Sequence, residues 1–191
     1  MLPVSRLGGF GILLEPLVEP YRELLRAAAD DPRIWEFTLA RGDGAGFDPW
    51  FDAALAETAA GRRFAFAVRR ADGEVLGSTS YLDLGTGHPR LEIGSTWYHP
   101  AVWDTAVNPA CKLLLLAHAF ETLGCAVVGL RTDNFNFRSQ RAIEALGAKK
   151  DGVLRHHQAR RDGTARDSVM YSVLAGEWKD VKRYLEMRIS R

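Results

Sequence analysis

The sequence is short of cysteine and of net charge, and each shortage excludes a class of protein. Cys111 and Cys125 are its only cysteines, and both stand among apolar residues, where a reduced and buried thiol is the usual state. We therefore expect no disulfide. Lysine and arginine number 25 against 24 aspartates and glutamates, a formal net charge of +1, which is too small to hold a nucleic-acid backbone.

The sequence also lacks long apolar runs. No run approaches the roughly 18 apolar residues that span a bilayer, and the first residues do not have the pattern of a signal peptide. We therefore expect a cytoplasmic protein whose partners are neither nucleic acids nor membranes. The 191 residues, of which 47% are hydrophobic and 26% charged, are typical of one folded enzyme domain over 1–191.

What the chain does contain is an alternation of short segments with the period of strands and longer segments with the period of helices. Strands are predicted at 11–14, 64–68, 75–84, 91–98 and 126–130, with a loop at 85–89 and a late hairpin that turns at 161–163. Helices are predicted from 19, over 48–61, from 108 to about 123, over 136–146 and, amphipathic, from about 176. A helix of this length joins parallel strands, whereas the hairpins are antiparallel. The sequence therefore predicts a mixed α/β fold with a mixed sheet.

The turn that follows strand 91–98 is the first feature with a chemical role. Asn108-Pro109 is typical of a helix start, with an asparagine cap and a first-turn proline. The free backbone N–H groups and the positive dipole end of such a start favour an anion such as a pyrophosphate. An ordinary strand-to-helix loop explains the same residues, so both interpretations stay open.

Residues spread over most of the chain resemble one family. They are the run from Glu92-Ile93-Gly94 to His99-Pro100, the turn from Trp103 to Asn108, Lys112, and the segments 132–134, 136–139 and 146–148. Together they resemble the GNAT acetyltransferase superfamily and, within it, the RimJ/RimL type of ribosomal-protein N-acetyltransferase. The resemblance implies a mostly antiparallel sheet with one splayed parallel strand pair, acetyl-CoA as co-substrate, no metal, and an amine acceptor. It leaves a homodimer open.

The resemblance also implies where CoA binds. The pyrophosphate is expected at the turn formed by Trp103, Asp104, Thr105, Ala106, Val107 and Asn108. The family pattern there is Arg/Gln-x-x-Gly-x-Gly/Ala, and this chain departs from it at Trp103, Ala106 and Asn108. The pantetheine arm is expected between the two parallel strands, paired with backbone groups of Trp97, Tyr98 and His99.

Glu92 is the candidate general base, because it coincides with a glutamate that has this role in several members of the superfamily. Alternation along its strand places it on the face that also carries Gly94, Thr96 and Tyr98. The alternative is a solvated carboxylate at the strand end.

Ser139 is the candidate general acid. The family often has a tyrosine seven residues after the helix-start asparagine, here Asn136, but this chain has Ile143, which cannot donate a proton. An ordinary first-turn serine is the alternative for Ser139. Asn136 either caps the turn of Ser139 or bonds the cofactor near its thioester.

We therefore expect an N-acetyltransferase that transfers the acetyl group directly to a primary amine. An α-amine with a pKa of about 7.7–8.0 loses its proton more easily at pH 7 than a lysine at about 10.4, which favours a protein N-terminus over other amines. A small-molecule amine stays open. The rival interpretation is a non-catalytic acyl-CoA-binding module. Trp35 and Trp50 are expected to pack, with the wall of the acceptor groove as the alternative.

Overall fold

The computed structural model describes residues 6–84 and 89–190, and it contains one eight-stranded sheet in the order β1-β2-β3-β4-β5-β6-β8-β7. The strands are β1 (Leu7–Gly9), β2 (Ile12–Pro16), β3 (Arg63–Arg70), β4 (Val75–Leu82), β5 (Arg90–Tyr98), β6 (Val127–Asp133), β7 (Lys149–Ala159) and β8 (Ala165–Leu174). Only β5 and β6 pair in parallel, and the other described pairs are antiparallel. The predicted mixed α/β fold with one parallel pair is confirmed.

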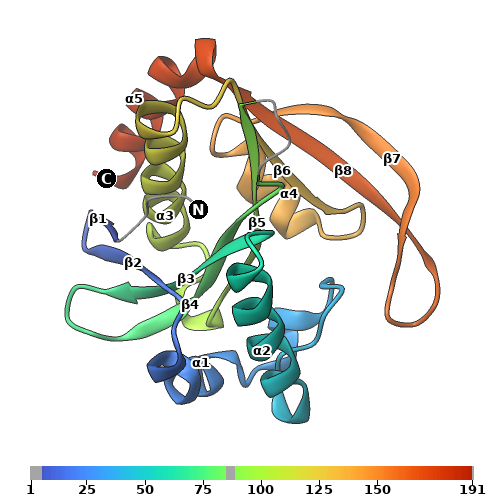
Figure 1. Cartoon of the computed structure of the whole chain (residues 1–191). Helices are drawn as coiled ribbons and strands as arrows, with labels where there is room; N and C mark the ends of the chain where they lie inside the picture. Colours follow the sequence, from blue (N-terminus) through green and yellow to red (C-terminus); the bar gives the residue numbers. More distant parts are fainter. Residues whose placement is uncertain (1–5, 85–88, 191) are drawn as a thin grey trace.

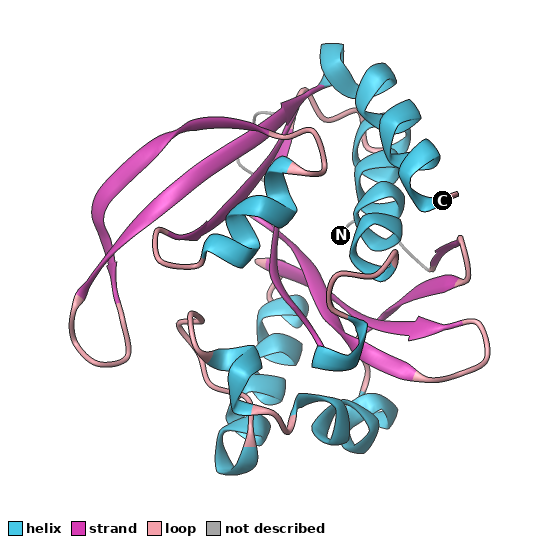
Figure 2. Ribbon diagram, turned by 180° about the vertical axis from the view of Figure 1, so that it is seen from behind, coloured by secondary structure: helices cyan, strands magenta, loops and turns pink. Residues whose placement is uncertain are grey.

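The helices cover the two faces of this sheet unequally (Figures 1 and 2). They are α1 (Arg22–Ala29), α2 (Phe47–Ala59), α3 (Val107–Ala117), α4 (Phe137–Glu144) and α5 (Trp178–Ile189). Buried residues of α1 and α2 form one apolar cluster with Ala65, Ala67 and Trp97. Buried residues of α3, α4 and α5 form a second, larger cluster with the opposite face of the sheet. In the described part of the chain, no helix has the length and apolar character needed to cross a membrane.

Several predicted elements differ from the structure in their bounds. The first strand is a hairpin of β1 and β2, because Phe10 and Gly11 turn the chain with positive φ angles of 54° and 74°. The helix predicted from 19 opens with a 3-10 turn, Glu19–Tyr21, before α1 begins. The strand predicted at 126–130 continues to Asp133. Most of the loop predicted at 85–89 lies outside the described residues.

The helix start at Asn108 was placed one residue late. Helix α3 begins at Val107, and no side chain caps it through a bond from its end residue Ala106. The hydroxyl of Thr105 accepts from the Val107 N–H at 3.3 Å instead. Asn108 is the second helical residue, so the prediction that its side chain caps the helix is wrong. The helix continues as a π-helical turn, His118–Thr122, close to its predicted end.

A β-bulge in β5 breaks the alternation on which the predicted faces depend. Ser78 pairs with Trp97 and Ser80 with Gly94, so Ser95 and Thr96 together oppose the one residue Thr79. Ser95 takes a positive φ of 45°, as a bulged residue can. The extra residue reverses the side-chain directions that follow it.

The prediction that Thr96 and Tyr98 share the face of Glu92 is therefore wrong. Tyr98 packs in the cluster of α3, and Thr96 bonds Lys112 of that helix at 2.8 Å. Trp97 points to the α2 side, where its ring centroid lies 5.3 Å from Trp35. The alternation of apolar and polar residues in a sequence does not reveal a bulge, because the pattern is intact in the part of the strand on each side of the extra residue.

The parallel strands β5 and β6 separate soon after they meet. Their register joins Arg90 to Val127 and ends at Glu92 opposite Gly129. Beyond that point the remaining residues of β5 and β6 do not pair with each other. The splay predicted between these strands is present, and it opens beside Glu92.

Strand β4 approaches the bulged strand β5 closely at Gly77, and a substitution there tests this contact. A Cβ at this position would overlap the Trp97 carbonyl oxygen and lie 2.8 Å from the Tyr98 Cα. Gly77→Ala should therefore lower the free energy of unfolding by about 1–3 kcal/mol, measured by urea denaturation. Gly176→Ala is the matched control, because a Cβ there meets no atom within 4 Å. Equal stabilities of the two variants would show that β4 and β5 are not held this closely.

Candidate active site

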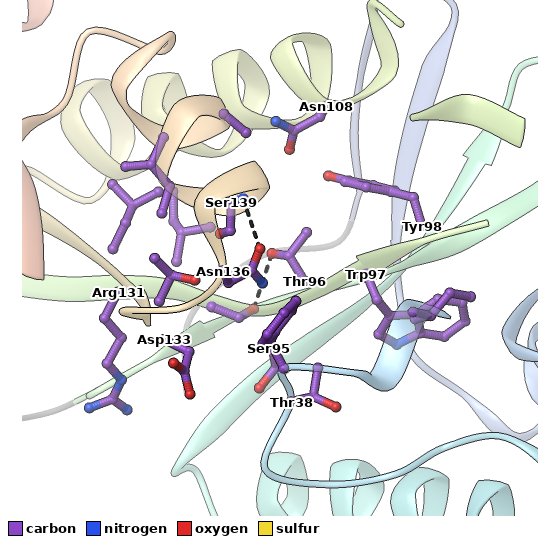
Figure 3. Close-up of a pocket in the computed structure, with 18 of the residues that line it drawn as sticks. Thr38, Ser95, Thr96, Trp97, Tyr98, Asn108, Arg131, Asp133, Asn136 and Ser139 are labelled. Carbon is purple, nitrogen blue, oxygen red and sulfur yellow. Dashed lines mark hydrogen bonds between the residues drawn. The ribbon is translucent and has the colours of Figure 1, made fainter. Parts of the chain in front are cut away.

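The separation of β5 and β6 opens into a cavity of about 820 Å³, within the usual range for small-molecule sites. Its walls come from the start of α3, the start of α4, the bulged part of β5 and the loop that contains Trp35. Figure 3 shows Asn108 and Tyr98 on the α3 side, and Asn136 and Ser139 at the start of α4. One cavity therefore brings together most of the predicted site residues.

The turn that leads into α3 forms one end of this cavity. Asp104, Thr105 and Ala106 are exposed, and Asp104 has a positive φ of 58°. First-turn N–H groups of a helix have no acceptor within the helix, and the helix dipole adds a partial positive charge. This end of the cavity fits a pyrophosphate despite the lost glycines.

A cation lies across the same end of the cavity. The guanidinium of Arg138, on α4, lies 3.5 Å from the centroid of the Trp103 ring. It joins the turn before α3 to the first turn of α4 and adds positive charge beside the exposed amides. In the sequence, Arg138 stands out only as part of a family motif, because nothing local shows that it reaches Trp103.

Two of the backbone groups expected to bind pantetheine already have protein partners. The Tyr98 carbonyl oxygen accepts from the Trp103 indole N–H at 2.9 Å. The His99 N–H donates to the Leu76 carbonyl oxygen at 2.8 Å. A carbonyl oxygen can accept twice, so Tyr98 keeps capacity for a ligand. Pairing of the arm with Trp97, Tyr98 and His99 stays a prediction.

Glu92 is buried at the point where the parallel strands part. It is 3% exposed, and its Oε1 lies 3.0 Å from the Arg131 Nε. Burial raises the pKa of Glu92 to about 7, and the positive charge of Arg131 opposes that rise. The alternative of a solvated strand-end carboxylate is wrong. A carboxyl group with this pKa exchanges protons near neutral pH.

Gly94 gives the Glu92 carboxyl group its space. A Cβ on Gly94 would lie 3.1 Å from the Glu92 Oε1 and 2.7 Å from the Leu82 Cδ1. The glycine at position 94 thus has a steric explanation, which the sequence alone does not reveal.

Asn136 and Ser139 lie together at the start of α4 (Figure 3). The Asn136 Oδ1 accepts from the Ser139 N–H at 2.9 Å, so the capping role is present. Ser139 and Ile143 both line the cavity, and Ile143 is also part of the apolar cluster of α3. Its aliphatic side chain gives no proton, which leaves the Ser139 hydroxyl as the candidate acid from this helix.

Lys112 is a buried cation to which the sequence analysis assigns no role. Its Nζ donates to the Thr96 Oγ1 at 2.8 Å, directly after the bulge, and lies 3.4 Å from the Thr79 Oγ1. Burial lowers its pKa to about 8. A single lysine inside the apolar run of α3 was the signal that could have identified it.

Trp35 and Trp50 pack, as predicted, and a role in the wall of the acceptor groove stays a prediction. They are buried in the cluster of α2, with ring centroids 5.8 Å apart, and they also line the cavity. No group of three or more His, Cys, Asp or Glu side chains that could hold a metal occurs in residues 6–84 and 89–190.

Comparison with known proteins agrees with this fold. The family profile described as the acetyltransferase (GNAT) domain matches residues 12–149. The "Uncharacterized N-acetyltransferase YoaA" of Bacillus subtilis (strain 168) is 29% identical over 106 residues, which are 56% of this chain and 59% of that protein. The match thus spans less than two thirds of this curated relative.

Solved structures match over nearly the full length. A structure assigned as an acetyltransferase from T. thermophilus is 34% identical, with 98% of each chain covered and a TM-score of 0.88. Mycobacterium smegmatis RimJ in complex with CoA-disulfide is 19% identical, with 97% of this chain and 93% of that chain covered and a TM-score of 0.79, and it shows the fold alone. The chain belongs to the GNAT acetyltransferase family.

Proposed function

We propose that this protein is an acetyl-CoA-dependent N-acetyltransferase that transfers the acetyl group directly to a primary amine. The observation that carries the proposal is the buried carboxyl group of Glu92, which lines the cavity where β5 and β6 separate. Acetyl-CoA supplies the acetyl group as an activated thioester. The protein then needs a binding site for acetyl-CoA, a base that deprotonates the amine and a proton donor for the departing sulfur.

Glu92 is the proposed base. A carboxyl group with a pKa of about 7 takes a proton from an α-ammonium group at a cost of about 1 kcal/mol, against about 4.6 kcal/mol for a lysine. This difference supports an α-amine as acceptor. An α-amine at a protein N-terminus, as in the RimJ/RimL type, and a cytoplasmic location are the finer parts of the proposal.

Ser139 is the proposed proton donor for the leaving thiolate. It lies in the first turn of α4, which forms one wall of the cavity, and Asn136 fixes the local backbone. The demand on this donor is small, because an ordinary thiol has a pKa of about 8.5 and its thiolate departs readily.

The cysteines support direct transfer. Cys111 and Cys125 are both buried, and burial raises the pKa of each, that of Cys111 to about 11. A thiol with a raised pKa forms little of the nucleophilic thiolate. The amine of the acceptor is therefore the proposed nucleophile.

The test is release of free thiol from acetyl-CoA in the presence of candidate amines, corrected for hydrolysis without an amine. Glu92→Gln should lower kcat by about 10²- to 10⁴-fold, because the variant removes the base. CoA affinity should persist. Glu144→Gln is the control, since this carboxylate lies on α4 and bonds the Tyr171 hydroxyl at 3.0 Å.

Two results would contradict this proposal. Unchanged kcat in Glu92→Gln at pH 7 would remove Glu92 as the base. CoA binding without thiol release for any amine would favour the rival acyl-CoA-binding module. The altered turn from Trp103 to Asn108 and the isoleucine at 143, in place of the family's tyrosine, make that module the second candidate.

The raised pKa of Glu92 also predicts how stability depends on pH. The folded carboxyl group titrates at about 7 against 4.5 in its ordinary state, so the folded protein binds more protons between these values. Stability from this group is present below about pH 4.5 and is lost as pH rises through about 7, by on the order of 3 kcal/mol. Urea denaturation from pH 5 to 8 should show a smaller loss in Glu92→Gln. Equal losses in both proteins would contradict the buried carboxyl group.

A further inference from the structure

Two arginines line the cavity on the side of Glu92 that faces away from the α3 turn. Arg131 lies on β6 and Arg166 on β8, and these strands are neighbours in the sheet. Arg166 is 7% exposed, whereas the Arg131 side chain is 28% exposed. Figure 3 shows Arg131 beside Asp133 at this end of the cavity. Neither arginine has a role in the transfer described above.

Arg166 has a buried donor without an acceptor. The Asp133 carboxylate is bound by Arg160 through two hydrogen bonds of 2.8 and 3.0 Å, and its Oδ1 also accepts from the Phe135 N–H. The Arg166 Nε lies 3.8 Å from the Asp133 Oδ2, too far for a hydrogen bond. Among the described residues, this Nε atom therefore has no hydrogen-bond partner.

A buried guanidinium donor without a partner is costly, and a ligand is one way to satisfy it. The Gln158 amide oxygen, opposite Arg166 in the register of β7 and β8, is also buried without a donor in the described part of the chain. Both residues line the cavity. The Arg166 Nε needs an acceptor and the Gln158 amide oxygen needs a donor, so a molecule that carries both a carboxylate and an ammonium group can satisfy both.

The charges around this point favour an anion. Arg131, Arg160 and Arg166 meet there with the two carboxyl groups of Glu92 and Asp133. The ammonium group of an acceptor would add one more positive charge beside Glu92. A second positive group on the acceptor would be repelled, whereas a carboxylate would match the planar fork of a guanidinium.

We propose that Arg131 and Arg166 bind a carboxylate carried by the acceptor amine. Arg131 contacts Glu92 at 3.0 Å, so the bound carboxylate lies within a few bonds of the amino group that Glu92 deprotonates. The acceptor is thus an α-amine with a nearby carboxylate. A peptide whose first residue is acidic keeps the low amine pKa on which the proposed base depends. A free amino acid is the less favoured source, because its own carboxylate raises the pKa of its amine. This inference rests on the proposed acetyl transfer and specifies its substrate class.

The test compares acceptors with and without the anionic group, each at a pH at which the same fraction of its amine is unprotonated, because a neighbouring carboxylate raises the pKa of an amine. Alanine is compared with alanine amide, and Asp-Ala-Ala amide with Asn-Ala-Ala amide, while spermidine serves as a polycation. Thiol release gives kcat and KM for each. The carboxylate member should exceed its neutral partner in kcat/KM by about 10- to 100-fold in at least one pair. The pair that responds distinguishes a free amino acid from an acidic N-terminus.

Arg166→Gln should abolish this preference by raising KM for the carboxylate acceptor about 10- to 100-fold, with kcat for the neutral acceptor retained. Arg166→Lys keeps the charge but not the planar pair of donors, so its KM for the carboxylate acceptor should lie between those of the unchanged protein and Arg166→Gln. Arg155→Gln, an exposed arginine on β7, is the matched control and should keep the preference. Thermal unfolding of each variant shows whether it is folded.

The outcomes separate this inference from the proposed function. Turnover that favours neutral amines or spermidine, or a preference that survives in folded Arg166→Gln, overturns the carboxylate site and leaves acetyl transfer standing. Absence of thiol release with every amine overturns both. A preference lost in Arg166→Gln and kept in Arg155→Gln supports both.

Discussion

The extra residue in β5 is the constraint on which the rest of the site depends. The bulge at Ser95 sends Trp97 toward α2 and Tyr98 toward α3, so one strand serves both apolar clusters. It also lies in the part of β5 that no longer pairs with β6. Because β5 packs on both of its faces, it keeps its position even where it no longer pairs with β6. The gap between the two strands therefore stays open in the middle of the sheet.

The chemistry of Glu92 follows from its position at the last paired residue of β5. Apolar packing and the sheet remove water from the carboxyl group, while Arg131 provides one opposing charge. Burial, and not the charge pair with Arg131, is the larger cause of the Glu92 pKa of about 7. Arg166 and Gln158 line the same cavity as Glu92, so the proposed base and the proposed carboxylate site lie in one cavity.

Much of the fold could be predicted from the sequence, since strand and helix periods and glycine stops are local signals. The parallel pair, the late hairpin and the helix start at Asn136 are examples. Side-chain direction after Ser95 could not be predicted, because a bulge depends on pairing with β4. The cap at Asn108 failed because Thr105 competes for the same helix end. Arg131, Arg138 and Arg166 were missed because their importance depends on contacts between distant strands and helices.

The most direct test is a crystal structure of the protein with CoA bound. We expect the pyrophosphate about 3 Å from backbone N–H groups of the turn from Thr105 to Asn108, and the sulfur in the splay between β5 and β6, between Glu92 and Ser139. A CoA molecule whose pyrophosphate lies away from this turn, or that leaves the splay empty, would contradict the proposed site.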